Sequence, residues 1–85
     1  MKVKMIGSHL CQDTLFALMK LKDAGVEVDF EDISASFPAL KDFLHARDND
    51  PVYETVKAAG GIGIPYFVFE DGSSSLDYKE VLKKL

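Results

Sequence analysis

A single cysteine, Cys11, lies between an apolar segment and a helical pattern in the stretch GSHLCQDT. A thiolate at a helix N-terminus accepts hydrogen bonds from unpaired backbone N–H groups and gains from the positive end of the helix dipole. If Cys11 is the N-cap of the helix that follows, Thr14 is the third helical residue, where its hydroxyl and N–H can both approach the sulfur. The pattern therefore predicts a nucleophilic thiol at Cys11, with Thr14 supporting the thiolate.

A thiolate of this kind attacks a disulfide sulfur and forms a mixed disulfide. Thr14 cannot resolve that species, so an external thiol has to release the protein. Asp13 counts against strong activation, because a carboxylate in the first helical turn repels a neighbouring thiolate. The alternative is that Asp13 is the N-cap and Cys11 is a small, partly buried apolar side chain, as most free cysteines are.

His9 lies two residues before the sulfur, where its imidazolium form would favour the thiolate. The alternative is an exposed histidine in a turn. A metal site built from His9 and Cys11 lacks further ligands within the chain. No metal is therefore predicted unless a second subunit or an external thiol completes the site.

The elements that position these residues follow from the hydrophobic periodicity. Alternation predicts strands, spacing of three and four residues predicts helices, and the pairs Gly60-Gly61 and Asp71-Gly72 predict turns. In chain order, we expect a strand at 2–6, a helix at 12–24, a strand at 25–32, a helix from Ser36 to about 47, a short helix at 50–59, strands at 64–70 and 73–76, and a helix at 77–85.

This order, βαβ-α-ββα, predicts an α/β fold with a four-stranded mixed sheet and helices on both faces. The first two strands should be parallel because a helix connects them. The near-continuously apolar segment IPYFVFE should be the best-buried strand, with Pro65 at its first position. The 85 residues are expected to form a single domain, 1–85.

Composition excludes several classes of protein. One cysteine forms no internal disulfide, which favours a reducing, cytoplasmic setting. The charged start MKVKMIG is not a signal peptide, and no apolar run is long enough for a membrane span. A net charge of −4 without a dense Lys/Arg cluster argues against nucleic acid as a partner.

Two motifs carry a resemblance that covers the whole chain. SHLCQDT lies between the first strand and the first helix, and GIGIPYFVFEDG precedes and includes the third strand and its turn. In both places the chain resembles the glutaredoxins, in particular the short glutaredoxin-related proteins of bacteria. The resemblance implies a thioredoxin-like fold and a monothiol site of the Cys-x-x-Thr type.

The resemblance also implies how a substrate is held. On residue type alone, the Ile64–Pro65 bond is expected to be trans, because only about 5–6% of X-Pro bonds are cis. The resemblance implies a cis bond that turns the Ile64 backbone toward the thiol, to pair with the main chain of glutathione or a peptide. The residues implied to contact this substrate are His9, Gln12, Ile64, Pro65 and Asp77.

The chain departs from the family pattern at two positions. Gly63 replaces the usual threonine, and no Gly-Gly pair precedes the last helix, where relatives hold the γ-glutamyl end of glutathione. Asp77 is either the acid that remains of that site or, with Glu80, part of a helix-capping pattern. Whether glutathione is the thiol used is left open by these departures.

The function expected from this reading is a monothiol thiol-disulfide oxidoreductase, a monomer or weak dimer. Its expected partners are a small thiol or a protein disulfide: Cys11 forms a mixed disulfide by exchange with a disulfide, and glutathione or another low-molecular-weight thiol resolves it as co-substrate. No resident cofactor is required. The alternatives are an iron-sulfur cluster carrier, or a non-enzymatic binding module in which the cysteine is inert.

Overall fold

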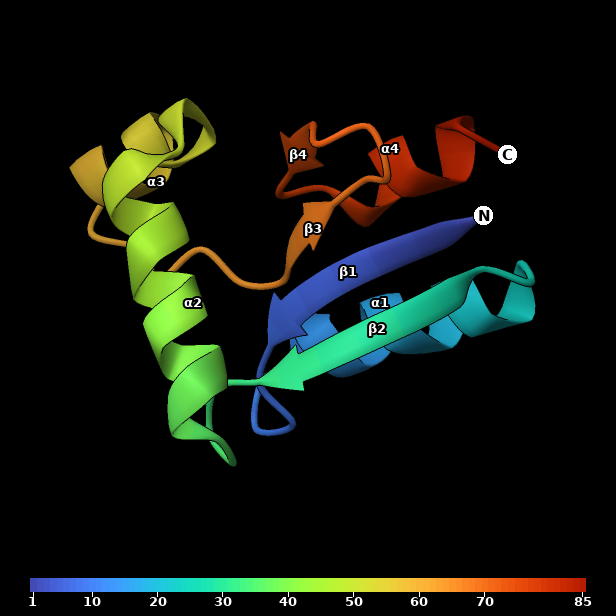
Figure 1. Cartoon of the computed structure of the whole chain (residues 1–85), viewed down its shortest axis with the longest axis horizontal. Helices are drawn as coiled ribbons and strands as arrows, with labels where there is room; N and C mark the ends of the chain where they lie inside the picture. The colour runs from blue at the N-terminus through green and yellow to red at the C-terminus, as the bar shows by residue number, and fades with distance from the viewer.

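Four strands form one mixed sheet in the order β2-β1-β3-β4 in the computed structural model, which describes all 85 residues (Figure 1). The elements in chain order are β1 (Lys2–Gly7), α1 (Gln12–Asp23), β2 (Glu27–Asp32), α2 (Phe37–Asn49), the 3₁₀ helix η1 (Pro51–Tyr53), α3 (Glu54–Ala58), β3 (Tyr66–Val68), β4 (Ser74–Ser75) and α4 (Tyr78–Lys83). The predicted βαβ-α-ββα order is confirmed, with the middle helical region divided into α2, η1 and α3.

The sheet pairing follows from the connections. β1 and β2 are joined through α1 and run parallel, with Gly7 opposite Asp32 at the end of the ladder. β3 is antiparallel to β1, and β4 is antiparallel to β3. β2 therefore lies at one edge, as its polar alternation predicts, while β1 and β3 are central.

Side-chain alternation along β1 and β3 divides the core between the two faces of the sheet. One face buries Val3 and Met5 against Ala17 and Leu21 of α1 and Val81 of α4. The opposite face carries the second cluster, which α2 and η1 cover, with the buried residues Ile6, Phe43, Tyr53 and Tyr66. Helices thus cover both faces, as the sequence predicts.

Two details differ from the sequence-based expectation. The ladder of β3 spans Tyr66–Val68 instead of 64–70, because Pro65 has no N–H to donate and the backbone from Phe69 onward forms the hairpin turn. In α1 the residues that face the sheet are Thr14, Ala17 and Leu21. Leu15 and Met19, which have helical spacing in the sequence, are about half exposed, at 49% and 52%.

The cap of α4 is formed by Asp77, whose carboxylate accepts a hydrogen bond from the Lys79 N–H at 2.9 Å. Glu80 does not complete a capping box, since its carboxylate pairs with Lys83 at 3.2 Å. No helix in the fold has both the length and the apolar character needed to span a membrane.

Candidate functional site

Cys11 is the N-cap residue of α1, with an extended backbone (φ −100°, ψ 120°). Its N–H donates to the Ser8 carbonyl at 3.0 Å, and its carbonyl accepts from the Leu15 N–H at 3.1 Å. The alternative in which Asp13 caps the helix is therefore wrong. The thiol is partly exposed, and the N–H groups of residues 12 to 14 have no partner within the chain. These three donors are available to a thiolate or to a bound ligand.

Thr14 follows Cys11 by three residues, but its hydroxyl hydrogen-bonds to the Ser8 backbone and not to the Cys11 sulfur. Its side chain is fully buried, and its hydroxyl accepts a hydrogen bond from the Ser8 N–H at 3.3 Å. The expected hydrogen bond between Thr14 and the Cys11 sulfur is absent from the structure. Thr14 also packs against Gly7 so closely that a Cβ on Gly7 would lie 2.6 Å from its methyl group. Thr14 therefore fixes the turn that carries the cysteine.

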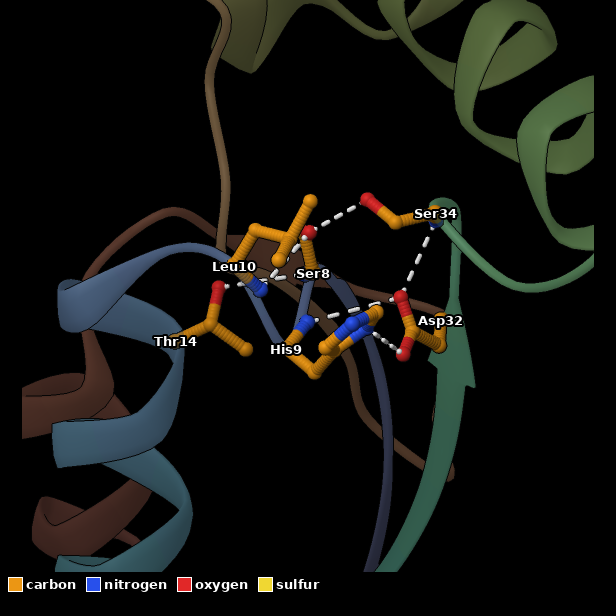
Figure 2. Close-up of polar contacts among 6 residues, drawn as sticks. All are labelled: Ser8, His9, Leu10, Thr14, Asp32 and Ser34. Atoms are coloured by element: carbon orange, nitrogen blue, oxygen red, sulfur yellow. Dashed lines mark hydrogen bonds and ion pairs between the residues drawn. The ribbon is translucent and has the colours of Figure 1, made fainter.

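His9 points toward the end of β2 and pairs with Asp32, with 2.6 Å between Nδ1 and Oδ2 (Figure 2). The other carboxylate oxygen of Asp32 accepts from the Ser34 N–H at 3.0 Å and from the His9 N–H at 3.4 Å. Partial burial alone would raise the pKa of the Asp32 carboxyl, but these hydrogen bonds outweigh it and hold the pKa below its ordinary value. His9 is thus exposed, as one alternative had it, but it is bound to a carboxylate.

A second polar contact runs beside the first. The Ser8 and Ser34 hydroxyl groups lie 2.5 Å apart, and the Ser8 hydroxyl also accepts from the Leu10 N–H at 3.1 Å. Sequence reasoning missed Ser8, Asp32 and Ser34. The signal that could have found them is the parallel pairing of β1 with β2, which places the residues after each strand at the same edge of the sheet.

The segment before β3 forms the other side of the candidate site. Its Ile64–Pro65 peptide bond is cis, which is the isomer that the family resemblance implies and not the one expected from residue type alone. Neither the N–H nor the carbonyl of Ile64 has a hydrogen-bond partner within the chain. Both groups are therefore free to pair with the main chain of a ligand.

The three carbonyls that precede Ile64 are all held from the helical region. Arg47 of α2 donates to the Gly61 carbonyl at 2.7 Å and to the Ile62 carbonyl at 3.2 Å. The Tyr53 hydroxyl donates to the Gly63 carbonyl at 2.7 Å. Gly63 has a φ of +88°, and the Tyr53 ring occupies the space where a Cβ would lie. A threonine is therefore excluded at this position by both backbone conformation and packing.

A groove of about 210 Å³ lies between the first turns of α1, the Ile64–Pro65 segment and the start of α4. It is lined by Asp13, Phe16, Ile64, Pro65, Leu76, Asp77 and Tyr78, and we call it the α1–α4 groove. Of the predicted contact residues, it brings together Ile64, Pro65 and Asp77. Gln12 is exposed and does not line it, while His9 is bound to the end of β2. Cys11 lies two residues before Asp13, at the N-cap of the helix that forms one wall.

Outside the α1–α4 groove, a second hollow and the acidic, histidine and cysteine side chains add no further candidate chemistry. A hollow of about 240 Å³ lies along residues 33–37 and contains no titratable side chain. No group of three or more His, Cys, Asp or Glu side chains is arranged to hold a metal ion. The sequence-predicted site residues are found at Cys11 and in the α1–α4 groove, and we take these two features as the candidate site.

The chain is 34% identical over 74 residues to an uncharacterised protein of Haemophilus influenzae. It belongs to the same family as that protein. The similarity covers 87% of this chain and 86% of the relative, so the two share nearly the whole domain and not one motif alone. No family model matches the chain, and no solved structure matches it.

Proposed function

We propose that this chain is a monothiol thiol-disulfide oxidoreductase with a thioredoxin-like, glutaredoxin-related fold. The fold assignment is supported by the strand order β2-β1-β3-β4, with β1 parallel to β2 and antiparallel to β3. It is also supported by the position of the cysteine, which follows the central strand β1 and begins α1. A cysteine so placed lies beyond the carboxyl end of a central strand and is partly exposed, so a disulfide can reach it.

The observation that carries the proposal is that the helix whose N-cap is Cys11 lines the same groove as the Ile64–Pro65 segment. Cys11 is a partly exposed N-cap with unpaired N–H groups in the turn that follows it. Asp13 of the same turn lines the α1–α4 groove together with Ile64 and Pro65, and the Ile64 backbone is unpaired. A peptide disulfide can thus pair its main chain with the Ile64 backbone while its sulfur approaches Cys11.

The reaction consists of two exchanges that balance without a resident cofactor. The Cys11 thiolate attacks one sulfur of a disulfide, a new S–S bond forms to Cys11, and the second sulfur leaves as a thiolate that takes up a proton. An external thiolate then attacks the sulfur joined to Cys11, and Cys11 leaves as a thiolate. One external thiol is oxidised for each substrate thiol released.

The direct test is the reactivity of Cys11 in the folded protein. The positive N-terminal field of a helix favours a nearby anion by about 1 kcal/mol, and the unpaired N–H groups after Cys11 can donate to negative charge on the sulfur. We expect iodoacetamide to alkylate native Cys11 about two to three times faster at neutral pH than the urea-unfolded chain, because a stabilised thiolate is also a weaker nucleophile. Asp13→Asn should be faster still, whereas Asp23→Asn, which removes the same charge at the far end of α1, should match the original.

The two exchange steps are tested by incubating the protein with bis(2-hydroxyethyl) disulfide and following the mass of the protein. We expect a mixed disulfide at Cys11 that 2-mercaptoethanol reverses, and no adduct on Cys11→Ser. Native alkylation as slow as in urea, together with no mixed disulfide, would refute the proposal. The fold would then be a binding module with an inert cysteine.

A further inference from the structure

The charged residues that line the α1–α4 groove are all acidic. Asp13 and Asp77 are its only charged lining residues, and no lysine, arginine or histidine lines it. Asp13 makes no hydrogen bond or ion pair within the chain, and Asp77 uses one carboxylate oxygen to cap α4. Two exposed carboxylates therefore face one groove without a cation to neutralise them.

Three cations on neighbouring elements have contacts within the chain, and one of them, Lys20, lies over a residue that lines the groove. Lys20 of α1 lies over the Phe16 ring, 5.4 Å from its centre, and Lys83 of α4 pairs with Glu80. Arg47 donates to carbonyls on the helical side of the segment before β3. The net charge of −4 adds a long-range field of the same sign as the groove.

The remaining lining of the groove is apolar. Phe16 and Tyr78 meet edge to face, with ring centres 5.7 Å apart, and Leu76, Ile64 and Pro65 complete the walls. An apolar wall with carboxylates along it fits a ligand that has a short aliphatic stem and a positive end. An anionic thiol such as glutathione, which carries two carboxylates and one ammonium, would find no cation here for its carboxylates.

We propose that the α1–α4 groove selects thiols and disulfides that carry a positive charge a few atoms from the sulfur, and disfavours anionic ones. This inference rests on the proposed function, because it names the class of substrate that reaches Cys11. The shared chemistry is an aminothiol group, whether from a small molecule or from a cysteine with lysine or arginine neighbours in a peptide. A peptide would in addition pair its backbone with Ile64.

The experiment compares three small disulfides of similar size and graded charge on the native chain: cystamine, bis(2-hydroxyethyl) disulfide and 3,3′-dithiodipropionate. Rates of mixed-disulfide formation at Cys11 are divided by those of the urea-unfolded chain, which corrects for the intrinsic reactivity of each disulfide. At about 20 mM salt we expect cystamine to exceed dithiodipropionate by about ten-fold, with the neutral disulfide between them. The ratio should fall several-fold at about 0.5 M salt.

Variants assign the effect to the groove. Asp13→Asn and Asp77→Asn should each lower the cystamine-to-dithiodipropionate ratio about three-fold, and the double variant should bring it near one. Asparagine also caps helices well, so α4 is expected to stay folded in Asp77→Asn. Asp23→Asn carries the same change in net charge on the same helix outside the groove, and it should keep the original ratio.

The outcomes separate the two proposals. Equal corrected rates for all three disulfides, with Cys11 still fast, would overturn the charge selection and leave the oxidoreductase standing. Faster reaction with dithiodipropionate would overturn it as well. No adduct with any disulfide would refute the oxidoreductase itself. A Lys-Cys-Lys peptide disulfide faster than cystamine indicates a peptide source, and the reverse order indicates a small aminothiol; both orders support cationic selection.

Discussion

Thr14 shows how one buried side chain places a reactive neighbour. It lies under the turn of residues 8 to 11, and its hydroxyl is the hydrogen-bond partner of the buried Ser8 N–H. Gly7 provides the space that Thr14 fills. Cys11 is held at the N-cap because the residue three positions later is anchored against the end of β1.

Replacing Thr14 by valine keeps the shape and removes the acceptor. Because the Ser8 N–H would then be buried without a partner, we expect Thr14→Val to lower the free energy of unfolding by about 1–3 kcal/mol. Urea denaturation of the variant beside the original chain measures this difference. A change of less than about 0.3 kcal/mol would show that Ser8 finds another partner, and that Thr14 contributes packing alone.

Thr14 also shows which features of a single residue can be predicted from the sequence. The spacing of Cys11 and Thr14 correctly places both at the start of α1, because capping depends on local backbone geometry. The direction of the Thr14 hydroxyl depends on the end of β1, which packs beneath it only after the sheet has formed. The sequence therefore predicts the position of Thr14 correctly but not the hydrogen-bond partner of its hydroxyl, which is the Ser8 N–H.

At the scale of elements, the turn after β1 is fastened to the end of β2. Asp32 accepts from the side chain and the N–H of His9, while Ser8 and Ser34 join their hydroxyl groups alongside (Figure 2). These contacts connect residues more than 20 positions apart in the sequence. They couple the position of the cysteine turn to the β2–α2 connection.

The hydrogen bonds to the Asp32 carboxylate make the stability of the fold depend on pH in the acid range. The pKa of Asp32 is lowered in the folded chain, so its contribution is present above the unfolded value of about 3.9 and is lost as the pH falls through the folded value. We expect Asp32→Asn to be less stable than the original chain at pH 7 and to lose less stability between about pH 5 and 3. Urea unfolding across that range checks both statements, and parallel pH profiles for the two proteins would contradict them.

Element order was predictable from periodicity, whereas the exposure of some large apolar residues on α1 and α2 was not. Leu15 and Met19 suggested the buried face of α1, yet the sheet contacts the smaller Thr14 and Ala17. A helix close to a sheet favours small residues at the contact, and the periodicity of large apolar residues does not report this. Similarly, Phe37 begins α2 but is 82% exposed. Hydrophobic spacing therefore identifies most of the core but does not show which large apolar side chains at the surface of α1 and α2 stay exposed.

Across the whole molecule, one carboxylate joins three segments that are distant in sequence. Asp50 follows α2, and its Oδ2 accepts from the Tyr66 hydroxyl of β3 at 2.6 Å and from the Ser74 hydroxyl of β4 at 2.5 Å. Its other oxygen accepts from the Val52 N–H and begins η1. Burial and this hydrogen bond to Asp50 raise the pKa of Tyr66 to about 12. Burial, followed by the nearby Tyr66 and Asp50, also raises the pKa of Tyr53.

The raised pKa values of Tyr53 and Tyr66 predict that the folded chain loses stability at alkaline pH. Tyr66 ionises near pH 10 when unfolded, so its contribution to stability is complete below pH 10 and is lost as the pH rises toward about 12. We expect tyrosinate absorbance from Tyr53 and Tyr66 to rise together with unfolding, and Tyr66→Phe to flatten the decline in stability over this range. A tyrosinate signal from Tyr66 at pH 10 in the folded chain would contradict this expectation.

The middle helical region of residues 37–59 also has a consequence for binding entropy. Its Arg47 and Tyr53 side chains hold the carbonyls of Gly61, Ile62 and Gly63, so the first residue of that segment with a free backbone is Ile64. A ligand that pairs with Ile64 therefore meets a backbone whose conformational freedom was already lost when the chain folded. Such preorganisation leaves more of the interaction energy for affinity, and it makes the long helical region a support for recognition at a distance from the groove.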